Sequence, residues 1–296
     1  MIPENKVKIM TERPSVSSHA VQTGLKPLPG VKNIIAIASG KGGVGKSTVT
    51  ANLALALQAE GARVGVLDAD IYGPSQPMML GATTRPLVQD KKMLPVVCHG
   101  IQTMSIGYLV EEDTPMVWRG PMVSMALQQM LNDTLWQDLD YLIIDLPPGT
   151  GDIQLTLAQK VPLSAALVVT TPQDIALLDA RRAIEMFNKV RVPILGVVEN
   201  MSYHRCTQCG HHDALFGEGG GERIAAQYGV KVMGAVPLAR PIREQVDQGC
   251  PTVVHDPEGE VSQIFRTIAR QVMRSLAQQK KDYAAKFPTI TVEKGA

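Results

Sequence analysis

Short apolar runs alternate with amphipathic segments along most of this 296-residue chain. Six of these runs are rich in Val, Ile and Leu and contain almost no polar residue before their ends. Strands that are apolar throughout are buried on both faces, which is typical of a parallel sheet. The predicted strands lie at residues 33–39, 63–70, 141–148, 165–172, 193–200 and 231–238.

The segments between these runs have helical patterns. An alternation of strands and helices predicts an α/β fold with a doubly wound, mostly parallel sheet and right-handed crossovers. The predicted helices lie at residues 46–61, 173–190, 220–229, 240–249 and 260–287.

Residues 72 to 135 interrupt this rhythm. They contain several prolines, a hairpin pattern at 91–107 and a helical pattern from Pro121 to Leu135. We interpret them as an insertion within a single domain. The expected organisation is a flexible leader at 1–30, one domain at 31–281 with the insertion and a cysteine-containing loop at about 201–218, and a C-terminal tail at 282–296.

The composition narrows the class of protein. Hydrophobic residues make up 45% of the chain and charged residues 19%, which predicts a packed core. The net charge of +1 provides no general attraction to nucleic acid. The chain has no signal-peptide pattern and no apolar run of about 20 residues, so no membrane association is expected. Four scattered cysteines do not form a disulfide framework, which indicates a cytoplasmic protein with free thiols.

A phosphate-binding loop, GKGGVGKST, follows the first predicted strand and opens a helix. It satisfies the pattern G-x-x-x-x-G-K-[ST] in the structural context that the pattern requires. Its glycines allow backbone N–H groups to turn toward an anion, and the helix N-terminus adds its dipole. We expect Lys46 to contact the β- and γ-phosphates of ATP and Ser47 to ligate Mg²⁺. The expected nucleotide-binding residues of the loop are Gly40, Lys41, Gly42, Gly43, Val44, Gly45, Lys46, Ser47 and Thr48.

Carboxylates follow two of the predicted strands at the edge where α/β sheets bind ligands. Asp145 ends its strand and is the Walker B candidate, holding Mg²⁺ through water. Asp70 fits a residue that orients the attacking water, and Asp68 fits a support for the metal, although a solvated turn is the alternative for both. Asp152 suits the cap of the following helix, and the glycines at 147–151 would let that loop respond to a γ-phosphate.

Several motifs together resemble one family. GKGGVGKST, LDADIYGPS, VWRGPM, DLPPGTGDIQLTLAQ, TPQDIAL, ENMS and CxxCG are similar to those of the Mrp/ApbC-type iron–sulfur cluster carrier ATPases, from about Gly30 to about Pro257. The resemblance implies a P-loop NTPase fold and a homodimer. It also implies slow ATP hydrolysis coupled to the transfer of a [4Fe–4S] cluster, received from upstream scaffold proteins and passed to apoproteins.

The loop also resembles the deviant Walker A of the wider MinD/ParA and nitrogenase-iron-protein class. In that class the lysine placed like Lys41 reaches the partner subunit's nucleotide, and an asparagine placed like Asn200 recognises adenine; a turn cap is the alternative for Asn200. Many bacterial members carry a further domain of roughly a hundred residues before the P-loop. Only about thirty residues precede the first strand here, so what that domain contributes stays open.

Cys206 and Cys209 offer two thiolates where a tetrahedral metal site needs four ligands. A zinc ribbon would need a second CxxC within about 15 to 20 residues, and none follows. A Cys₂His₂ site using His204, His211 or His212 would strain the short loop. Two copies related by a two-fold axis would supply four thiolates, the set that holds a [4Fe–4S] cluster. We favour this bridging cluster over structural zinc and over inert thiols.

The expected catalytic residues are Lys41, Lys46, Asp70 and Asp145. Two other functions compete with a cluster carrier. A MinD/ParA-like positioning ATPase would use a basic amphipathic segment such as 260–281 on a membrane. A zinc or nickel metallochaperone would use the same two thiols for a different metal.

Overall fold

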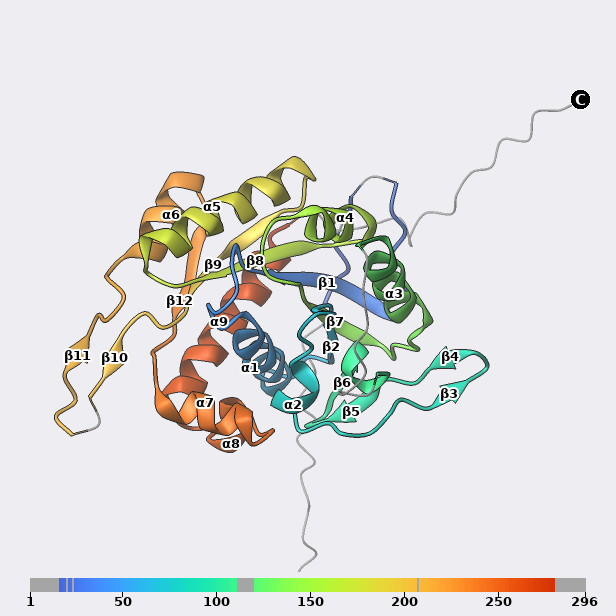
Figure 1. Cartoon of the computed structure of the whole chain (residues 1–296), viewed down its shortest axis with the longest axis horizontal. Helices are drawn as coiled ribbons and strands as arrows, with labels where there is room; N and C mark the ends of the chain where they lie inside the picture. Colours follow the sequence, from blue (N-terminus) through green and yellow to red (C-terminus); the bar gives the residue numbers. More distant parts are fainter. Residues whose placement is uncertain (1–15, 20, 23, 111–119, 207, 280–296) are drawn as a thin grey trace, which may run out of the picture.

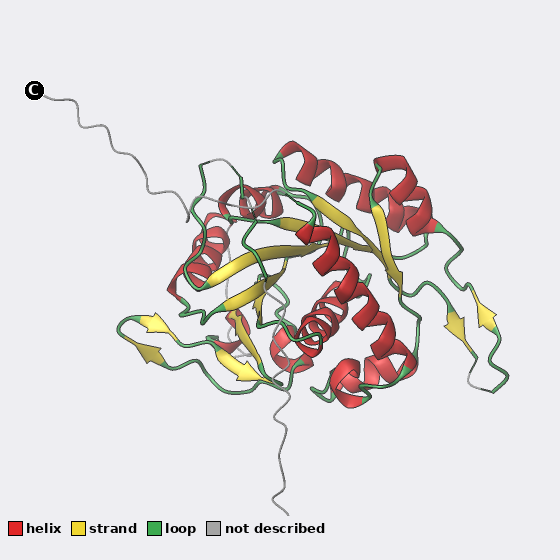
Figure 2. Ribbon diagram, turned by 180° about the vertical axis from the view of Figure 1, so that it is seen from behind, coloured by secondary structure: helices red, strands yellow, loops and turns green. Residues whose placement is uncertain are grey.

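A computed structural model describes residues 16–19, 21–22, 24–110, 120–206 and 208–279. Its centre is a sheet in the order β12-β9-β8-β1-β7-β2-β6-β5, with helices on both faces (Figures 1 and 2). All neighbouring strands are parallel except β5, which is antiparallel to β6. The predicted doubly wound, mostly parallel sheet is confirmed. Its strands are β1 (Val31–Ala38), β2 (Val64–Asp68), β5 (Val96–Cys98), β6 (Ile101–Ser105), β7 (Leu139–Asp145), β8 (Ala165–Thr170), β9 (Ile194–Glu199) and β12 (Lys231–Ala235).

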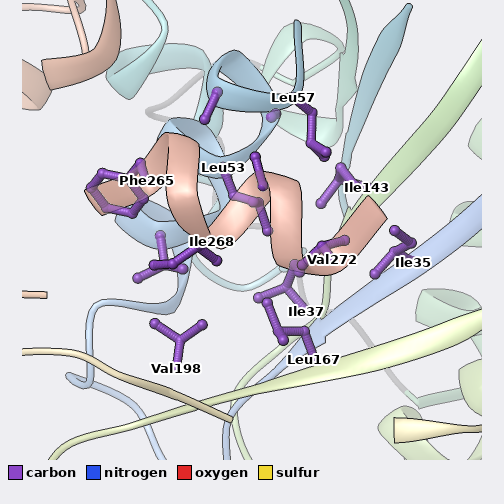
Figure 3. Packing of buried hydrophobic residues seen from close by; sticks show 14 of the residues in the cluster. Ile35, Ile37, Leu53, Leu57, Ile143, Leu167, Val198, Phe265, Ile268 and Val272 are labelled. Carbon is purple, nitrogen blue, oxygen red and sulfur yellow. The ribbon is translucent and has the colours of Figure 1, made fainter. Parts of the chain in front are cut away.

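Helices cover both faces because the strands carry apolar side chains on both sides. Ile35 and Ile37 of β1 point into a cluster with α1 and α9, where Phe265 and Ile268 are fully buried (Figure 3). Ile34 and its alternate neighbours face a second cluster with α3, α4 and the end of α5. The helices are α1 (Lys46–Ala59), α2 (Gln76–Met79), α3 (Gly120–Asp133), α4 (Asp152–Lys160), α5 (Asp174–Lys189), α6 (Gly220–Tyr228), α7 (Arg240–Asp247), α8 (Thr252–His255) and α9 (Glu260–Ala277).

The segment at 72–135 contributes to the main sheet. The predicted hairpin is present as β5 and β6, and β6 pairs in parallel with β2. The sequence did not predict α2, the 3-10 turn at Ile106–Tyr108 or the short hairpin of β3 (Val88–Gln89) and β4 (Lys92–Met93). Residues 111–119, with the first half of the VWRGPM motif, lie outside the described residues.

The last helix is shorter than predicted. α9 ends at Ala277 instead of reaching residue 287, and residues from 280 onward lie outside the described part of the chain. Leu276 is the last residue of the helix that is buried in the core. Ala277 and Gln278 after it are exposed, so continuing the helix through them would bury little apolar surface. None of the helices in the described residues has the length and apolar character that crossing a membrane requires.

The parallel register brings the functional segments to one edge of the sheet. Asp145 at the end of β7 lies beside Ile37 of β1 on one side and beside Asp68 of β2 on the other. Glu199 at the end of β9 pairs with Thr170 at the end of β8. The loops that follow these strands therefore share the carboxyl edge, as the sequence predicted.

Candidate functional site

The loop between β1 and α1 has the shape that a phosphate site requires. Gly43 and Gly45 have positive φ angles of 81° and 79°, which favour glycine. A Cβ added to Gly40 would collide with the backbone of Asp179 in α5. Lys46 begins α1 directly after Gly45, so the helix N-terminus points its free N–H groups into the loop.

Lys46 and Asp145 form a buried ion pair at the centre of the site. The Nζ of Lys46 lies 2.5 Å from Oδ1 of Asp145 and 3.3 Å from the hydroxyl of Ser47. The hydroxyl of Thr50 also donates to Asp145, at 3.0 Å. Asp145 is fully buried and Lys46 nearly so, which strengthens the attraction between them. A phosphate in the loop would compete with Asp145 for the same ammonium group.

Asp68 fixes the loop that follows β2. Its carboxylate accepts the backbone N–H groups of Ser75 and Gln76, at 3.0 and 3.1 Å, and the hydroxyl of Ser105 at 3.2 Å. Burial, and after it the nearby charge of Asp145, raise the pKa of Asp68 to about 7. Asp68 is thus placed to hold the start of α2 in position.

Asp70 is half-buried at the same edge. Burial raises its pKa, and the positive charge of Lys46 opposes that rise. Asp152 is the first residue of α4, while Gly151 occupies the capping position, so the expected cap is wrong by one residue. The negative charge of Asp152 in the first turn of α4 still interacts favourably with the helix dipole. The side chain of Gln154 donates to the carbonyl of Pro148 and shapes the glycine-containing loop.

Hard oxygen donors gather near the phosphate loop, as Mg²⁺ requires. The hydroxyl of Ser47 and the carboxylate of Asp145 both lie within hydrogen-bonding distance of Lys46 Nζ. The residues present therefore suit a magnesium ion held by Ser47 and, through water, by Asp145.

Gln76 belongs to this site, although the sequence did not single it out. Its Nε2 donates to Asp145 Oδ2 at 2.9 Å and to the carbonyl of Ser47 at 3.0 Å. The side chain is almost fully buried, and its Oε1 has no partner within the described residues. The only available signal was its position directly after LDADIYGPS.

Asn200 lies against the phosphate loop from the end of β9. Its Nδ2 donates to the carbonyl of Val44 at 2.8 Å, and its backbone N–H donates to the carbonyl of Thr170. Lys41 is half-buried, and the hydroxyl of Ser39 donates to its backbone carbonyl. The structure thus places the side chain of Asn200 against the loop that carries Lys41 and Lys46.

Cys206 and Cys209 lie at the tip of a small hairpin that projects from the body of the molecule (Figure 1). This cysteine hairpin, residues 204–213, is formed by β10 (His204–Arg205) and β11 (His212–Asp213). The N–H of Cys206 donates to the carbonyl of His211, and the N–H of Gly210 donates back to Cys206, both at 2.9 Å. The backbone N–H groups of Cys209 and then Gln208 lower the pKa of the Cys206 thiol. The turn therefore favours the thiolate form of Cys206, which is the form in which cysteine binds metals.

In the described part of the chain, the nearby histidines are not gathered around the two cysteines. Within the described residues, no group of three or more His, Cys, Asp or Glu side chains is placed to hold a metal ion. His212 stacks on Tyr203, with ring centroids 4.8 Å apart, and His204 Nδ1 donates to the carbonyl of Leu238. The alternative of a Cys₂His₂ zinc site within one chain is therefore not supported.

Comparisons with known proteins agree with this geometry. Residues 30–273 match the family described as ParA: NUBPL iron-transfer P-loop NTPase. The iron-sulfur cluster carrier protein of Pseudomonas fragi is 60% identical over 257 residues, which cover 86% of this chain and 90% of that protein.

Two solved structures are similar in fold. A nucleotide-binding protein from Archaeoglobus fulgidus in complex with ADP has a TM-score of 0.70 and 37% identity, covering 80% of this chain and 93% of its own. The cell division ATPase MinD of Pyrococcus furiosus has a TM-score of 0.59 at 24% identity, covering 82% of this chain and 98% of its own, and supports the fold alone. The predicted P-loop NTPase fold is confirmed.

Proposed function

Because the chain belongs to the family of NUBPL-type iron-transfer P-loop NTPases, we propose that it is an ATP-hydrolysing carrier of iron–sulfur clusters. It acts as a cytoplasmic homodimer that receives a cluster from scaffold proteins and passes it to apoproteins. The name of the 60% identical Pseudomonas fragi relative supports the carrier role. The bound ADP of the Archaeoglobus fulgidus structure supports nucleotide binding.

The cysteine hairpin is the observation that carries the proposal. Cys209 is exposed, and the thiol of Cys206 receives backbone N–H groups that favour its thiolate. The described part of one chain supplies no third ligand beside them. A second copy related by a two-fold axis would supply the other two thiolates of a [4Fe–4S] cluster.

The phosphate loop provides the ATPase part of the proposal. Lys46 Nζ, which contacts Asp145, would be shared with the γ-phosphate of ATP, and Ser47 and, through water, Asp145 would hold Mg²⁺, which would neutralise phosphate charge. Asp70 orients the attacking water, and Lys41 reaches the nucleotide of the partner subunit. Asn200 recognises the adenine, as in the wider class. The ATPase domain extends over residues 31–281 and includes the cysteine hairpin.

Anaerobic reconstitution with iron and sulfide tests the cluster site. The wild-type chain is expected to gain a [4Fe–4S] absorption band that Cys206→Ala lacks, because a dimer of this variant keeps only two of the four thiolates that the cluster needs. Cys250→Ala is the matched control, since Cys250 is a half-buried thiol outside the hairpin, and it is expected to behave as wild type. Equal iron uptake by Cys206→Ala would refute the proposed site.

Lys46→Ala separates the ATPase from the cluster. Loss of the ammonium group that contacts the phosphates should lower ATP hydrolysis by at least about a hundredfold. The cysteine hairpin is unchanged in this variant, so reconstitution should still succeed, while delivery to an apoprotein should slow. Lys189→Ala, which alters an exposed lysine at the end of α5, is the control. Delivery at the wild-type rate by Lys46→Ala would remove the coupling from the proposal.

A further inference from the structure

Asn200 touches the phosphate loop at two points. Its Nδ2 donates to the carbonyl of Val44 at 2.8 Å, and both residues are buried, with 7% and 2% of their surface exposed. A Cβ added to Gly45 would collide with the same amide group and would lie 3.6 Å from Cε of Met201. Because residues 200 and 201 are packed directly against the phosphate loop, a change in the loop backbone displaces them too.

The same residues form the root of the cysteine hairpin. Glu199, directly before Asn200, accepts the hydroxyl of Ser202 at 2.6 Å, on the chain that enters the hairpin. Its other oxygen accepts the N–H of Gly221, at the start of α6, on the chain that leaves it. One buried carboxylate thus ties both ends of the hairpin together, next to the residue that contacts the phosphate loop.

The backbone between Asn200 and Cys206 has one residue in an unusual conformation. Met201 has a φ of 54°, an unusual left-handed conformation for a residue with a side chain. Beyond it, the N–H of Ser202 donates to the carbonyl of Val236, and the N–H of Leu238 donates to the carbonyl of Tyr203. A displacement at Met201 is therefore passed along a hydrogen-bonded segment toward Cys206.

We infer that Asn200 is a positioning residue that couples the phosphate loop to the cysteine hairpin, so that bound nucleotide changes the reactivity of Cys206 and Cys209. Phosphates draw the backbone N–H groups of the loop toward themselves and move the carbonyl of Val44. The amide of Asn200 follows that carbonyl, and the root of the hairpin moves with it. The inference rests on the proposed function and gives it a physical link between nucleotide and cluster sites.

Thiol alkylation of the cluster-free full chain tests the link. The protein is pulsed with iodoacetamide under anaerobic conditions, with and without saturating Mg·ADP or a non-hydrolysable Mg·ATP analogue, and each cysteine is quantified by mass spectrometry. In the wild type, nucleotide is expected to change the alkylation rates of Cys206 and Cys209 by about fivefold or more, the usual size of coupling between sites. Cys98 and Cys250 serve as internal references in the same sample.

Asn200→Asp removes the donor at nearly constant shape and is expected to abolish this response. Nucleotide occupancy is measured by calorimetry, so that every variant is compared when saturated. Asn132→Asp is the matched control, since Asn132 is exposed and its side chain donates to the carbonyl of Gln128 in its own helix, and it should respond as wild type does. Asn200→Ala is the second variant, used if Asn200→Asp does not fold.

The inference is overturned if nucleotide leaves the wild-type rates unchanged, or if a saturated Asn200 variant keeps the full response. A rise at all four cysteines of a variant would show general opening of the fold, and this also counts against a positioning role. No cluster is present in these samples. Failure of cluster reconstitution is thus a separate result, which bears on the proposed function alone.

Discussion

At the scale of single residues, Asp140 shows how the chain stabilises a carboxylate away from the phosphate edge. It accepts Lys32 Nζ at 2.7 Å and the backbone N–H of Arg63 at 2.9 Å. Burial disfavours its charged form. The N–H group of Arg63 and the positive charges of Lys32 and Arg63 outweigh burial and hold the pKa of Asp140 below its usual value. The ionised form therefore contributes to the stability of the folded chain.

We expect Asp140→Asn to lower the free energy of unfolding by about 1–3 kcal/mol at pH 7. Since the folded pKa lies below the unfolded one, the contribution of Asp140 is complete above about pH 4 and is lost as the pH falls further. The free energies of unfolding of the wild type and of Asp140→Asn, measured with urea, should differ less at pH 3 than at pH 7. The control is Asp138→Asn, whose side chain is 83% exposed and should change stability little. A difference that is constant with pH would contradict this account.

The sequence predicted those site residues that are close together along the chain and missed contacts between residues that are far apart in the sequence. The residues from Gly40 to Thr48 are consecutive, and the strand and helix beside them make their geometry recognisable. Gln76 was missed because its contacts to Ser47 and Asp145 depend on where α2 packs, which no short motif encodes. The contact of Asn200 with Val44 joins residues 156 positions apart and was hidden for the same reason.

At the scale of elements, α9 distinguishes the carrier from a membrane-positioning ATPase. Most of its apolar side chains, including Phe265 and Val272, are fully buried against α1 and the sheet (Figure 3). Two of its bases, Arg266 and Arg270, contact Glu60 at the end of α1, at 2.8 and 3.0 Å. The apolar face that would insert into a bilayer is thus used in the core, which is the usual role of such a helix.

We therefore expect no binding to lipid vesicles. In a flotation experiment with Mg·ATP, the full chain should stay in the bottom fraction with anionic vesicles as it does with neutral ones. An amphipathic helix needs an accessible apolar face to bind the interface, and most of the apolar face of α9 is buried in the core. Flotation with anionic vesicles that depends on ATP would favour the positioning ATPase instead.

The sequence predicted the buried elements better than the exposed ones. Five of the six predicted strands were found because they are almost entirely buried and apolar, whereas the edge strand β12 is partly exposed and was found from its shorter apolar run. Strands β10 and β11 have two residues each and carry polar side chains, so no periodic pattern could show them. The position of β6 beside β2 is set by packing between segments about 40 residues apart, which local pattern does not contain.

At the scale of the whole molecule, the two halves of the proposed function both call for a second copy. The cysteine hairpin offers two thiols, and its tip projects from the body (Figure 2). Ile175 and Leu178 on α5 are 66% and 48% exposed, close to Asp179, which packs against Gly40. An isologous dimer would cover such apolar side chains beside the nucleotide site and pair the hairpins.

This argument predicts both the mass and the iron content of the loaded protein. After anaerobic reconstitution, light scattering should give twice the 31.9 kDa of one chain, with about two iron atoms per chain. Because each copy supplies only two ligands, a chelator should remove the iron readily, and the bridging contribution to the dimer should be lost with it. Cys209→Ala should hold no cluster, whereas Cys98→Ala, at a half-buried thiol outside the hairpin, should load fully. Four iron atoms on a chain that stays monomeric would show that one copy completes the coordination alone, and the shared site would have to be abandoned.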